Sequence, residues 1–198
     1  MAENAYIVFD AESGDGLIID PGGEPDKLLE IINRRKIKIR AILLTHGHCD
    51  HIGAVMEIKN AFFDIPVVCG EDDAVFLVNP GYNMSSRFGD TVFFTPDVTV
   101  TDGGELYYAG IKIIALHTPG HTPGGVCYHI KEEGALFSGD TLFQNSIGRS
   151  DFFMGDHEKL IESIKEKLYS LPDETRVYPG HGGATSIKRE RENNPFTK

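Results

Sequence analysis

The segment that decides the fold of this chain is Thr45-His46-Gly47-His48-Cys49-Asp50-His51. It holds three of the eight histidines in 198 residues, and it follows a largely apolar run over residues 39–44. Such a run is typical of a buried strand. Two histidines separated by one residue point to the same side of an extended loop, whereas the aspartate and histidine after them point elsewhere if a helix begins there. Imidazoles gathered at a strand end indicate a metal site.

The same arrangement returns three times further along the chain. An apolar strand ends in small or turn-forming residues, and a residue of metal-ligand type follows: His121, Asp140 and His181. In each case a glycine stands immediately before the ligand, which permits a sharp turn and a close approach of the backbone. We therefore predict one site assembled from the ends of several strands.

Seven side chains are too many for one tetrahedral ion, so we predict two divalent metal ions. The ligands divide into one group for each ion and one bridging carboxylate: His46, His48 and His121 for the first, Asp50, His51 and His181 for the second, and Asp140 between them. Nitrogen and oxygen donors suit zinc, with iron or manganese as alternatives. Asp20, at the end of the strand expected at residues 17–19, is predicted to orient a ligand by a hydrogen bond. The alternative is a turn-forming role before Pro21-Gly22.

The bulk composition restricts the remaining classes. At 198 residues, with 40% hydrophobic and 25% charged residues, we expect a single domain over residues 1–198. The net charge of −11 argues against nucleic acid or an anionic membrane as partner, and no run approaches the ~20 apolar residues of a membrane helix. Three scattered cysteines and a start without an apolar leader predict a cytoplasmic protein with reduced thiols. The oligomeric state stays open.

The residue pattern predicts alternating strands and helices. Strands are expected at residues 6–9, 17–19, 39–44, 66–68, 98–100, 111–116, 126–130, 135–137 and 176–178. One helix is expected to open at Pro25-Asp26 and another to cover residues 156–169 with Asp156 as its N-cap. Shorter helices are expected after His51 and Gly70. This order predicts an α/β protein with two mixed sheets and helices outside them.

Taken together, these residues resemble the metallo-β-lactamase fold hydrolases over nearly the whole chain. The resemblance rests on residues 46–51 with His121, Asp140 and His181 downstream in that order. Five more segments are similar to the glyoxalase II-like branch, the hydroxyacylglutathione hydrolase-like proteins: residues 20–23, 118–124, 137–143, 147–152 and 178–182. The resemblance implies a four-layer αββα sandwich of the α/β (α+β) class, with the site at one edge of the two packed sheets.

The resemblance also implies an activity, namely hydrolysis of a small-molecule thioester or a related activated acyl compound. A water activated by the two cations is expected to attack the carbonyl carbon. Asp50 and Asp140 are the predicted catalytic residues, and Asp50 is expected to hold the nucleophile by a hydrogen bond. Arg149, in the loop over residues 143–153, is the candidate for binding a substrate carboxylate, and bracing of its own loop is the alternative. From residues 79–90, Tyr82 and Phe88 are candidates for the far wall.

Two other activities occur among proteins with similar motifs. Lactamases of this fold commonly carry a cysteine at the position of Asp140, which disfavours β-lactam hydrolysis. Persulfide dioxygenases resemble the branch but use a single iron, at residues matching His46, His121 and Asp140, and they remain the alternative. Glyoxalase II itself grips glutathione with a long C-terminal helical domain, whereas about fifteen residues follow Gly183 in this sequence. The acyl group and the thiol of the substrate therefore stay open.

Overall fold

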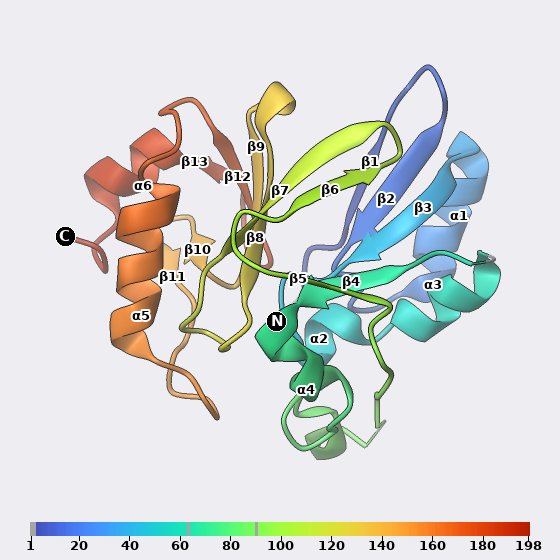
Figure 1. The fold of residues 1–198 in the computed structure, drawn as a ribbon, viewed down its shortest axis with the longest axis horizontal. Coiled ribbons are helices and arrows are strands. Elements are labelled where there is room, and N and C mark those ends of the chain that lie inside the picture. The colour runs from blue at the N-terminus through green and yellow to red at the C-terminus, as the bar shows by residue number, and fades with distance from the viewer. Residues whose placement is uncertain (1–2, 63, 90) are drawn as a thin grey trace.

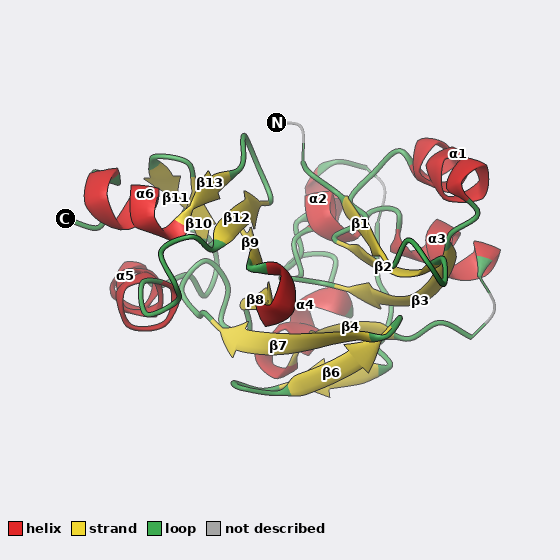
Figure 2. Ribbon diagram, turned by 90° about the horizontal axis from the view of Figure 1, so that it is seen from above, coloured by secondary structure: helices red, strands yellow, loops and turns green. Residues whose placement is uncertain are grey.

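The computed structural model describes residues 3–62, 64–89 and 91–198. Two mixed β-sheets pack face to face, and helices cover the outer face of each sheet (Figures 1 and 2). The predicted α/β class and the four-layer αββα arrangement are confirmed. Within the described ranges, none of the helices combines the length and apolar character that crossing a bilayer requires.

The first sheet has five strands in the order β1-β2-β3-β4-β5. Their bounds are β1 Tyr6–Phe9, β2 Asp15–Ile19, β3 Lys38–Leu43, β4 Val67–Gly70 and β5 Val98–Val100. Strands β1 and β2 are antiparallel, and β2 to β5 run parallel. Helices α1 (Pro25–Arg35) and α3 (Val55–Ala61) lie on the outer face of this sheet, on the right of Figure 2.

The second sheet has six strands in the order β13-β12-β9-β8-β7-β6. Their bounds are β6 Glu105–Tyr108, β7 Ile111–His117, β8 Val126–Ile130, β9 Ala135–Gly139, β12 Arg176–Pro179 and β13 Thr185–Ser186. Its outer face carries α5 (His157–Glu162), the π-helical continuation Ser163–Leu168, and α6 (Ile187–Asn193). Two short strands, β10 (Leu142–Phe143) and β11 (Ser146–Ile147), form a separate hairpin.

Three apolar clusters hold the four layers together, and the period-two alternation of the strands decides which residue enters which cluster. In β2, Leu17 and Ile19 face the second sheet, and Ile18 faces the helices. Ile164 of the π-helical segment packs in the third cluster, on the outer face of the second sheet. Burial of each such aliphatic side chain contributes roughly 1.5–3 kcal/mol. The fold therefore has substantial cores that do not depend on the polar site.

Most predicted elements are confirmed, with ends shifted by up to a few residues. Asp156 caps α5 as expected, because its side chain accepts a hydrogen bond from the Lys159 backbone N–H at 3.1 Å. A 3-10 turn (Glu71–Asp73) and α4 (Ala74–Leu77) follow Gly70. Helix α3 follows His51 as predicted, and a further one-turn helix, α2 (Cys49–Ile52), contains His51 itself. Strands β6, β10, β11 and β13 and helix α6 were not predicted from the sequence.

Candidate metal centre

The ends of β3, β9 and β12 bring the predicted ligands to one edge of the sandwich. Strands β9 and β12 are parallel neighbours in which Gly139 lies opposite Pro179, so Asp140 and His181 leave the sheet close together. In the first sheet Ile19 lies opposite Leu43, which sets Asp20 beside the start of the histidine segment. Carboxyl ends of parallel strands meet at the same edge of a sheet, which is where α/β proteins place their sites.

Three imidazoles converge first. The Nε2 atom of His121 lies 3.2 Å from Nε2 of His46 and 2.8 Å from Nδ1 of His48. All three side chains are buried, at 2–4% exposure. A tetrahedral ion with Zn–N bonds of 2.0–2.1 Å would require nitrogen–nitrogen spacings of about 3.3 Å. The 3.2 Å spacing is close to this value and the 2.8 Å spacing is shorter, so the three nitrogens converge on a space for at most one small cation.

Hydrogen bonds on the far side of the rings determine which nitrogen faces the centre. Nδ1–H of His121 donates to the backbone carbonyl of Arg149 at 2.6 Å, because a carbonyl can only accept, and this leaves Nε2 as the lone-pair atom. Nδ1 of His46 contacts Oγ1 of Thr45 at 3.2 Å. Burial, together with neighbouring imidazoles, lowers the pKa of His48 to about 3 and lowers the pKa of His46 and His121 as well. The three rings are therefore neutral, the form that binds metals.

A second group of ligand-type atoms surrounds His51. Asp50, His51 and His181 form one cluster of candidate ligand atoms, in which Nε2 of His181 lies 3.3 Å from Oδ2 of Asp50. Burial alone would raise the pKa of Asp50, but the hydrogen bond with His181 and the positive charges of His51 and His181 outweigh it, so the pKa lies below its ordinary value. The side chain of Asp50 is 47% exposed, so its ionised carboxylate faces the solvent side of the site.

Asp140 lies between the two groups. Its Oδ1 is 3.3 Å from Nε2 of His51, and its Oδ2 is 3.7 Å from Nε2 of His121 and 3.6 Å from Nε2 of His181. Among the described residues, Oδ1 of Asp140 and Nε2 of His51 are two of three buried side-chain atoms without a hydrogen-bond partner. Buried polar atoms without partners are costly, and a cation bound between them would satisfy both.

Asp20 accepts hydrogen bonds from both ends of the histidine segment, Thr45 and His51. Its Oδ2 accepts from Nδ1–H of His51 at 2.9 Å and from the Thr45 hydroxyl at 2.6 Å. Its Oδ1 accepts from the Thr45 backbone N–H at 2.7 Å. Burial alone would lower the pKa of His51, but the carboxylates of Asp20 and Asp140 outweigh it and hold that pKa well above its ordinary value. These contacts leave Nε2 of His51 directed toward Asp140.

Glu3 is a member of the site that sequence reasoning missed. It forms a cluster with Asp20 and His51, and its buried Oε1 is the third side-chain atom without a partner in the described chain. Burial, and then the charge of Asp20, raises the pKa of Glu3 to about 9. Sequence reasoning looked for ligand-type residues directly after an apolar strand, and Glu3 follows no strand. An isolated bridge between Glu3 and His181, near the end of β12, brings it to the site edge.

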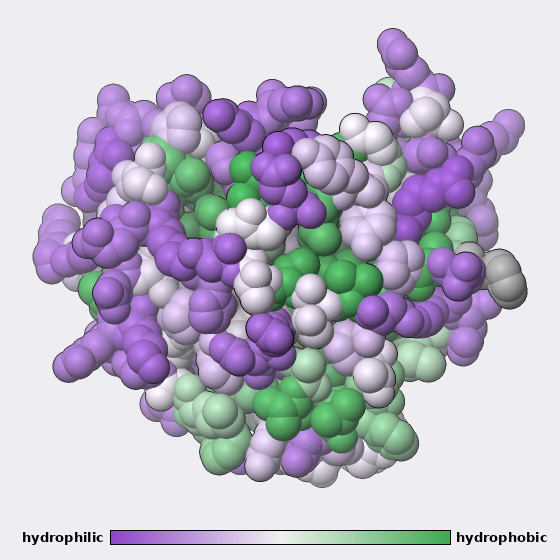
Figure 3. All heavy atoms as spheres, in the orientation of Figure 1, coloured by the Kyte–Doolittle hydropathy of each residue, from purple (hydrophilic) through white to green (hydrophobic). Residues whose placement is uncertain are grey.

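The site opens into a pocket of about 530 Å³, and five of the seven candidate ligands line it: His48, Asp50, His121, Asp140 and His181. From residues 79–90 it is Met84 that lines this pocket, whereas Phe88 lies in a neighbouring groove and Tyr82 packs on Phe153 at 4.5 Å between ring centroids. Asp90, the last residue of that loop, lies outside the described residues. Beside the pocket, exposed apolar residues such as Val78 gather around α4, at the lower end of the molecule (Figure 3).

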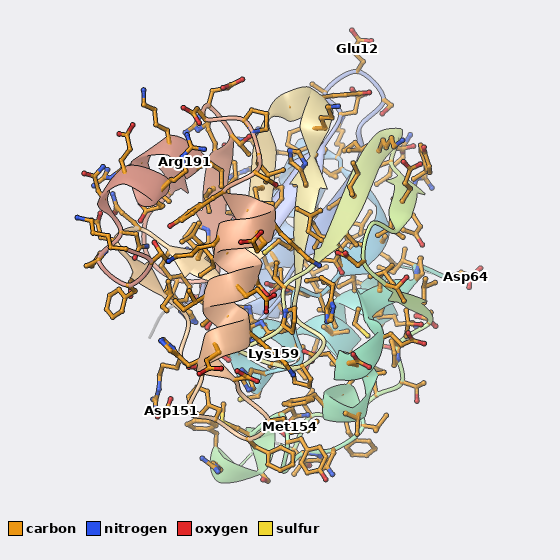
Figure 4. All side chains as sticks on the ribbon, turned by 60° about the vertical axis from the view of Figure 1, so that its left-hand side comes forward. Glu12, Asp64, Asp151, Met154, Lys159 and Arg191 are labelled. Carbon is orange, nitrogen blue, oxygen red and sulfur yellow. The ribbon has the colours of Figure 1, made fainter. Side chains whose placement is uncertain are left out.

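Arg149 lines the same pocket, but its guanidinium is already engaged. It forms two hydrogen bonds with Asp151, at 2.9 and 2.8 Å, and its charge lies 4.3 Å from the ring centroid of Phe152. Both charged side chains are exposed, and Figure 4 shows Asp151 at the outer edge of the molecule, on the loop before α5. The geometry is compatible with both predicted roles of Arg149, since Asp151 braces the loop and Nη1 makes neither of these hydrogen bonds.

The donor set as a whole fits divalent cations. It consists of imidazole nitrogens and carboxylate oxygens, and of the described residues no cysteine belongs to any of the four candidate ligand groups. Hard and borderline cations accept such nitrogen and oxygen donors. Residues 1–181 match the sequence profile of the metallo-beta-lactamase superfamily. The chain belongs to that superfamily.

Relatives within the superfamily are similar over almost their full length. The chain is 39% identical to "Hydroxyacylglutathione hydrolase GloC" of Haemophilus influenzae, a match that covers 98% of this chain and 92% of the relative. It is 40% identical to "Probable metallo-hydrolase YqgX" of Bacillus subtilis, with 98% and 91% covered. Family membership and the His/Asp cluster together support a metal-dependent hydrolase of the metallo-β-lactamase superfamily.

Solved structures of the superfamily superimpose closely. The structure described as BLEG-1 B3 metallo-beta-lactamase has a TM-score of 0.93 at 40% identity, and TTHA1623 in a di-iron-bound form has 0.84 at 39%, each with 98% of this chain and 94% of the other covered. ETHE1 from Myxococcus xanthus gives 0.82 at 28%, with 98% and 79% covered.

Proposed function

We propose that this protein hydrolyses small-molecule thioesters, in the manner of a hydroxyacylglutathione hydrolase, with two divalent metal ions. The observation that carries the proposal is the position of Asp140, whose two oxygens lie within 3.3–3.7 Å of imidazoles from both ligand groups. One ion would be held by His46, His48 and His121 and the other by Asp50, His51 and His181, with Asp140 shared. The similarity to the Haemophilus hydrolase supports the substrate class.

When bound, such ions lower the pKa of a coordinated water to about 7 and polarise an acyl carbonyl. The chain's own residues then have defined tasks. The half-exposed carboxylate of Asp50 accepts a hydrogen bond from the attacking water and orients it. Nδ1–H of His121 and of His51 remain on the Arg149 carbonyl and on Asp20, which prevents either ring from turning. Phe152 and Met84 reduce the access of bulk water to the carbonyl.

The pocket suits an acyl thioester of modest charge. Arg149 is the one lysine or arginine among the described residues that line it, and two of its donor groups are occupied by Asp151. Glutathione carries two carboxylates, so at most one of them has an arginine or lysine partner in this pocket. The rest of the substrate would lie against apolar side chains such as Phe143 and Ile147. The lining therefore supports recognition of the acyl group and the thioester more than of the whole tripeptide.

The proposal is tested by comparing S-lactoylglutathione with the lactoyl thioester of a truncated thiol. We expect both to be hydrolysed, with kcat/KM values within about tenfold, because one exposed ion pair contributes about 1 kcal/mol or less. Release of free thiol, followed with a thiol reagent, gives both rates. The control is the same pair of substrates with protein treated with a chelator.

Two other outcomes would contradict the proposal. Oxygen consumption with glutathione persulfide, one bound iron per chain and no thioester hydrolysis would make the protein a dioxygenase. Turnover of a β-lactam such as a penicillin with a far higher kcat/KM than that of any thioester would make it a lactamase. Glutathione preference of a thousandfold would leave the reaction intact but would show that residues outside this pocket recognise the tripeptide.

The role of Arg149 is tested by removing its partner as well as the arginine. If Arg149 binds a substrate carboxylate, Asp151→Asn releases its donors and lowers KM for S-lactoylglutathione, whereas Arg149→Ala raises KM by about two- to fivefold, the value of an exposed ion pair. If Arg149 only braces the loop, both variants raise KM alike. The truncated thioester is the control, because its KM should not change with the arginine.

A further inference from the structure

Asp73 is a fully buried carboxylate outside the set of predicted ligands. It ends the 3-10 turn that follows β4, and it is 0% exposed, whereas its neighbours Glu71 and Asp72 in the same turn are exposed. A buried carboxylate is costly unless hydrogen-bond donors surround it. The position of these donors indicates what the residue does.

Asp73 accepts three hydrogen bonds, and all three come from segments that carry candidate ligands. Oδ2 accepts from the backbone N–H of Gly47 at 2.8 Å and from the hydroxyl of Thr122 at 2.9 Å, and Oδ1 accepts from the backbone N–H of Gly124 at 2.7 Å. Gly47 stands between His46 and His48, and Thr122 directly follows His121. One carboxylate therefore joins the two loops whose imidazoles meet.

The backbone around Asp73 is pressed against the same two loops. A Cβ atom added at Gly124 would lie 2.1 Å from the backbone N of Asp73, and one added at Gly47 would lie 2.6 Å from Cβ of Phe76 in α4. Real side chains do not tolerate such distances, so the close approach requires glycine at both positions. Asp73 and α4 thus hold the loops at a fixed separation.

We propose that Asp73 is a positioning residue that sets the spacing of His46, His48 and His121 and thereby the affinity for the ion they bind. Its hydrogen bonds go to Gly47, between His46 and His48, and to Thr122 and Gly124, which follow His121 in the chain. The ring of His51 is held instead by a hydrogen bond to Asp20. Charge-assisted hydrogen bonds of this kind are strong, and removal of a group that orients a metal ligand typically lowers metal affinity 10–100-fold. The inference rests on the metal centre and not on the identity of the substrate.

Zinc affinity measured by chelator competition tests the proposal in two backgrounds that isolate the halves of the site. In His181→Ala, which keeps the three-imidazole group, Asp73→Asn should weaken zinc binding about 10–100-fold. In His48→Ala, which keeps the group around His51, the same change should alter the affinity less than threefold. Asp72→Asn is the matched control, because it removes the same charge from an exposed residue one position away.

A purely structural role gives a different result. It predicts that Asp73→Asn lowers the free energy of unfolding of the metal-free protein without distinguishing the two backgrounds. The zinc affinity would then fall equally in both backgrounds or stay unchanged in both. Either result would overturn the proposal. If Asp73→Asn does not fold, Thr122→Val removes a single donor from the same carboxylate and should show the same selectivity with a smaller effect, about three- to tenfold. Because no substrate enters these measurements, their failure would be distinct from failure of the proposed hydrolysis.

Discussion

Asp140→Ala is expected to abolish thioester hydrolysis, by about 10³-fold or more, and to leave the protein folded. Removal of one electrostatic group from a site of this kind already costs 10²–10³ in rate, and Asp140 contacts both ligand groups at once. Metal analysis of protein purified without added metal should show two equivalents in the wild type and fewer in the variant. Circular dichroism should be unchanged, since the apolar clusters lie between the layers and away from the site.

Asp140→Asn separates the two contributions of this side chain. It keeps one oxygen donor and nearly the same shape, so it should retain more metal than Asp140→Ala while remaining strongly impaired in hydrolysis. An unfolded metal-free Asp140→Ala protein would contradict the expectation, because the metals would then hold the fold together as well as perform the chemistry. Full activity with one equivalent of metal would contradict the shared position of Asp140.

Gly180→Ala is expected to cost at least about 10² in kcat/KM, although it adds only one methyl group. The new Cβ would lie 2.5 Å from Oδ1 of Asp140 and 2.5 Å from Cε1 of His51, so both side chains would have to move. A displacement of about 1 Å at a catalytic group can cost 10²-fold in rate. Metal content should fall together with activity, and both are measured on the same preparation.

Gly182→Ala is the matched control in the same loop. Gly182 has a φ of 81°, and a Cβ there would meet nothing within 4 Å. The alanine therefore carries only the strain of a left-handed conformation, about 1–2 kcal/mol, which should appear as a lower Tm with kcat/KM within about twofold of the wild type. Equal losses of activity in the two variants would show that general loop strain, and not contact with Asp140 and His51, is responsible.

The sequence by itself determined which ligand-type side chains stand at the strand ends and the architecture that carries them. Strand-like runs that end in a glycine and then a histidine or aspartate are local features, and the carboxyl ends of parallel strands are where α/β sheets place their sites. The two sheets, the outer helices and the convergence of His46, Asp140 and His181 followed from that pattern. The Asp156 cap was predictable because it too is a local feature: the backbone N–H that it binds belongs to Lys159, three residues along the chain.

Only the tertiary structure decided the groups that support the ligands. Asp73 could not be distinguished from the acidic residues beside it, because its three donors come from two loops, 26 to 51 positions away. Helix α6 is rich in charge, and it is placed by the burial of Ile187 and of Glu190, whose carboxylate accepts from the Asn145 backbone N–H at 2.7 Å. Glu3 reaches the site by a bridge to a residue 178 positions later. The candidate ligands are recognised from local sequence, whereas the support of a buried charge depends on which distant donors the packed layers bring to it.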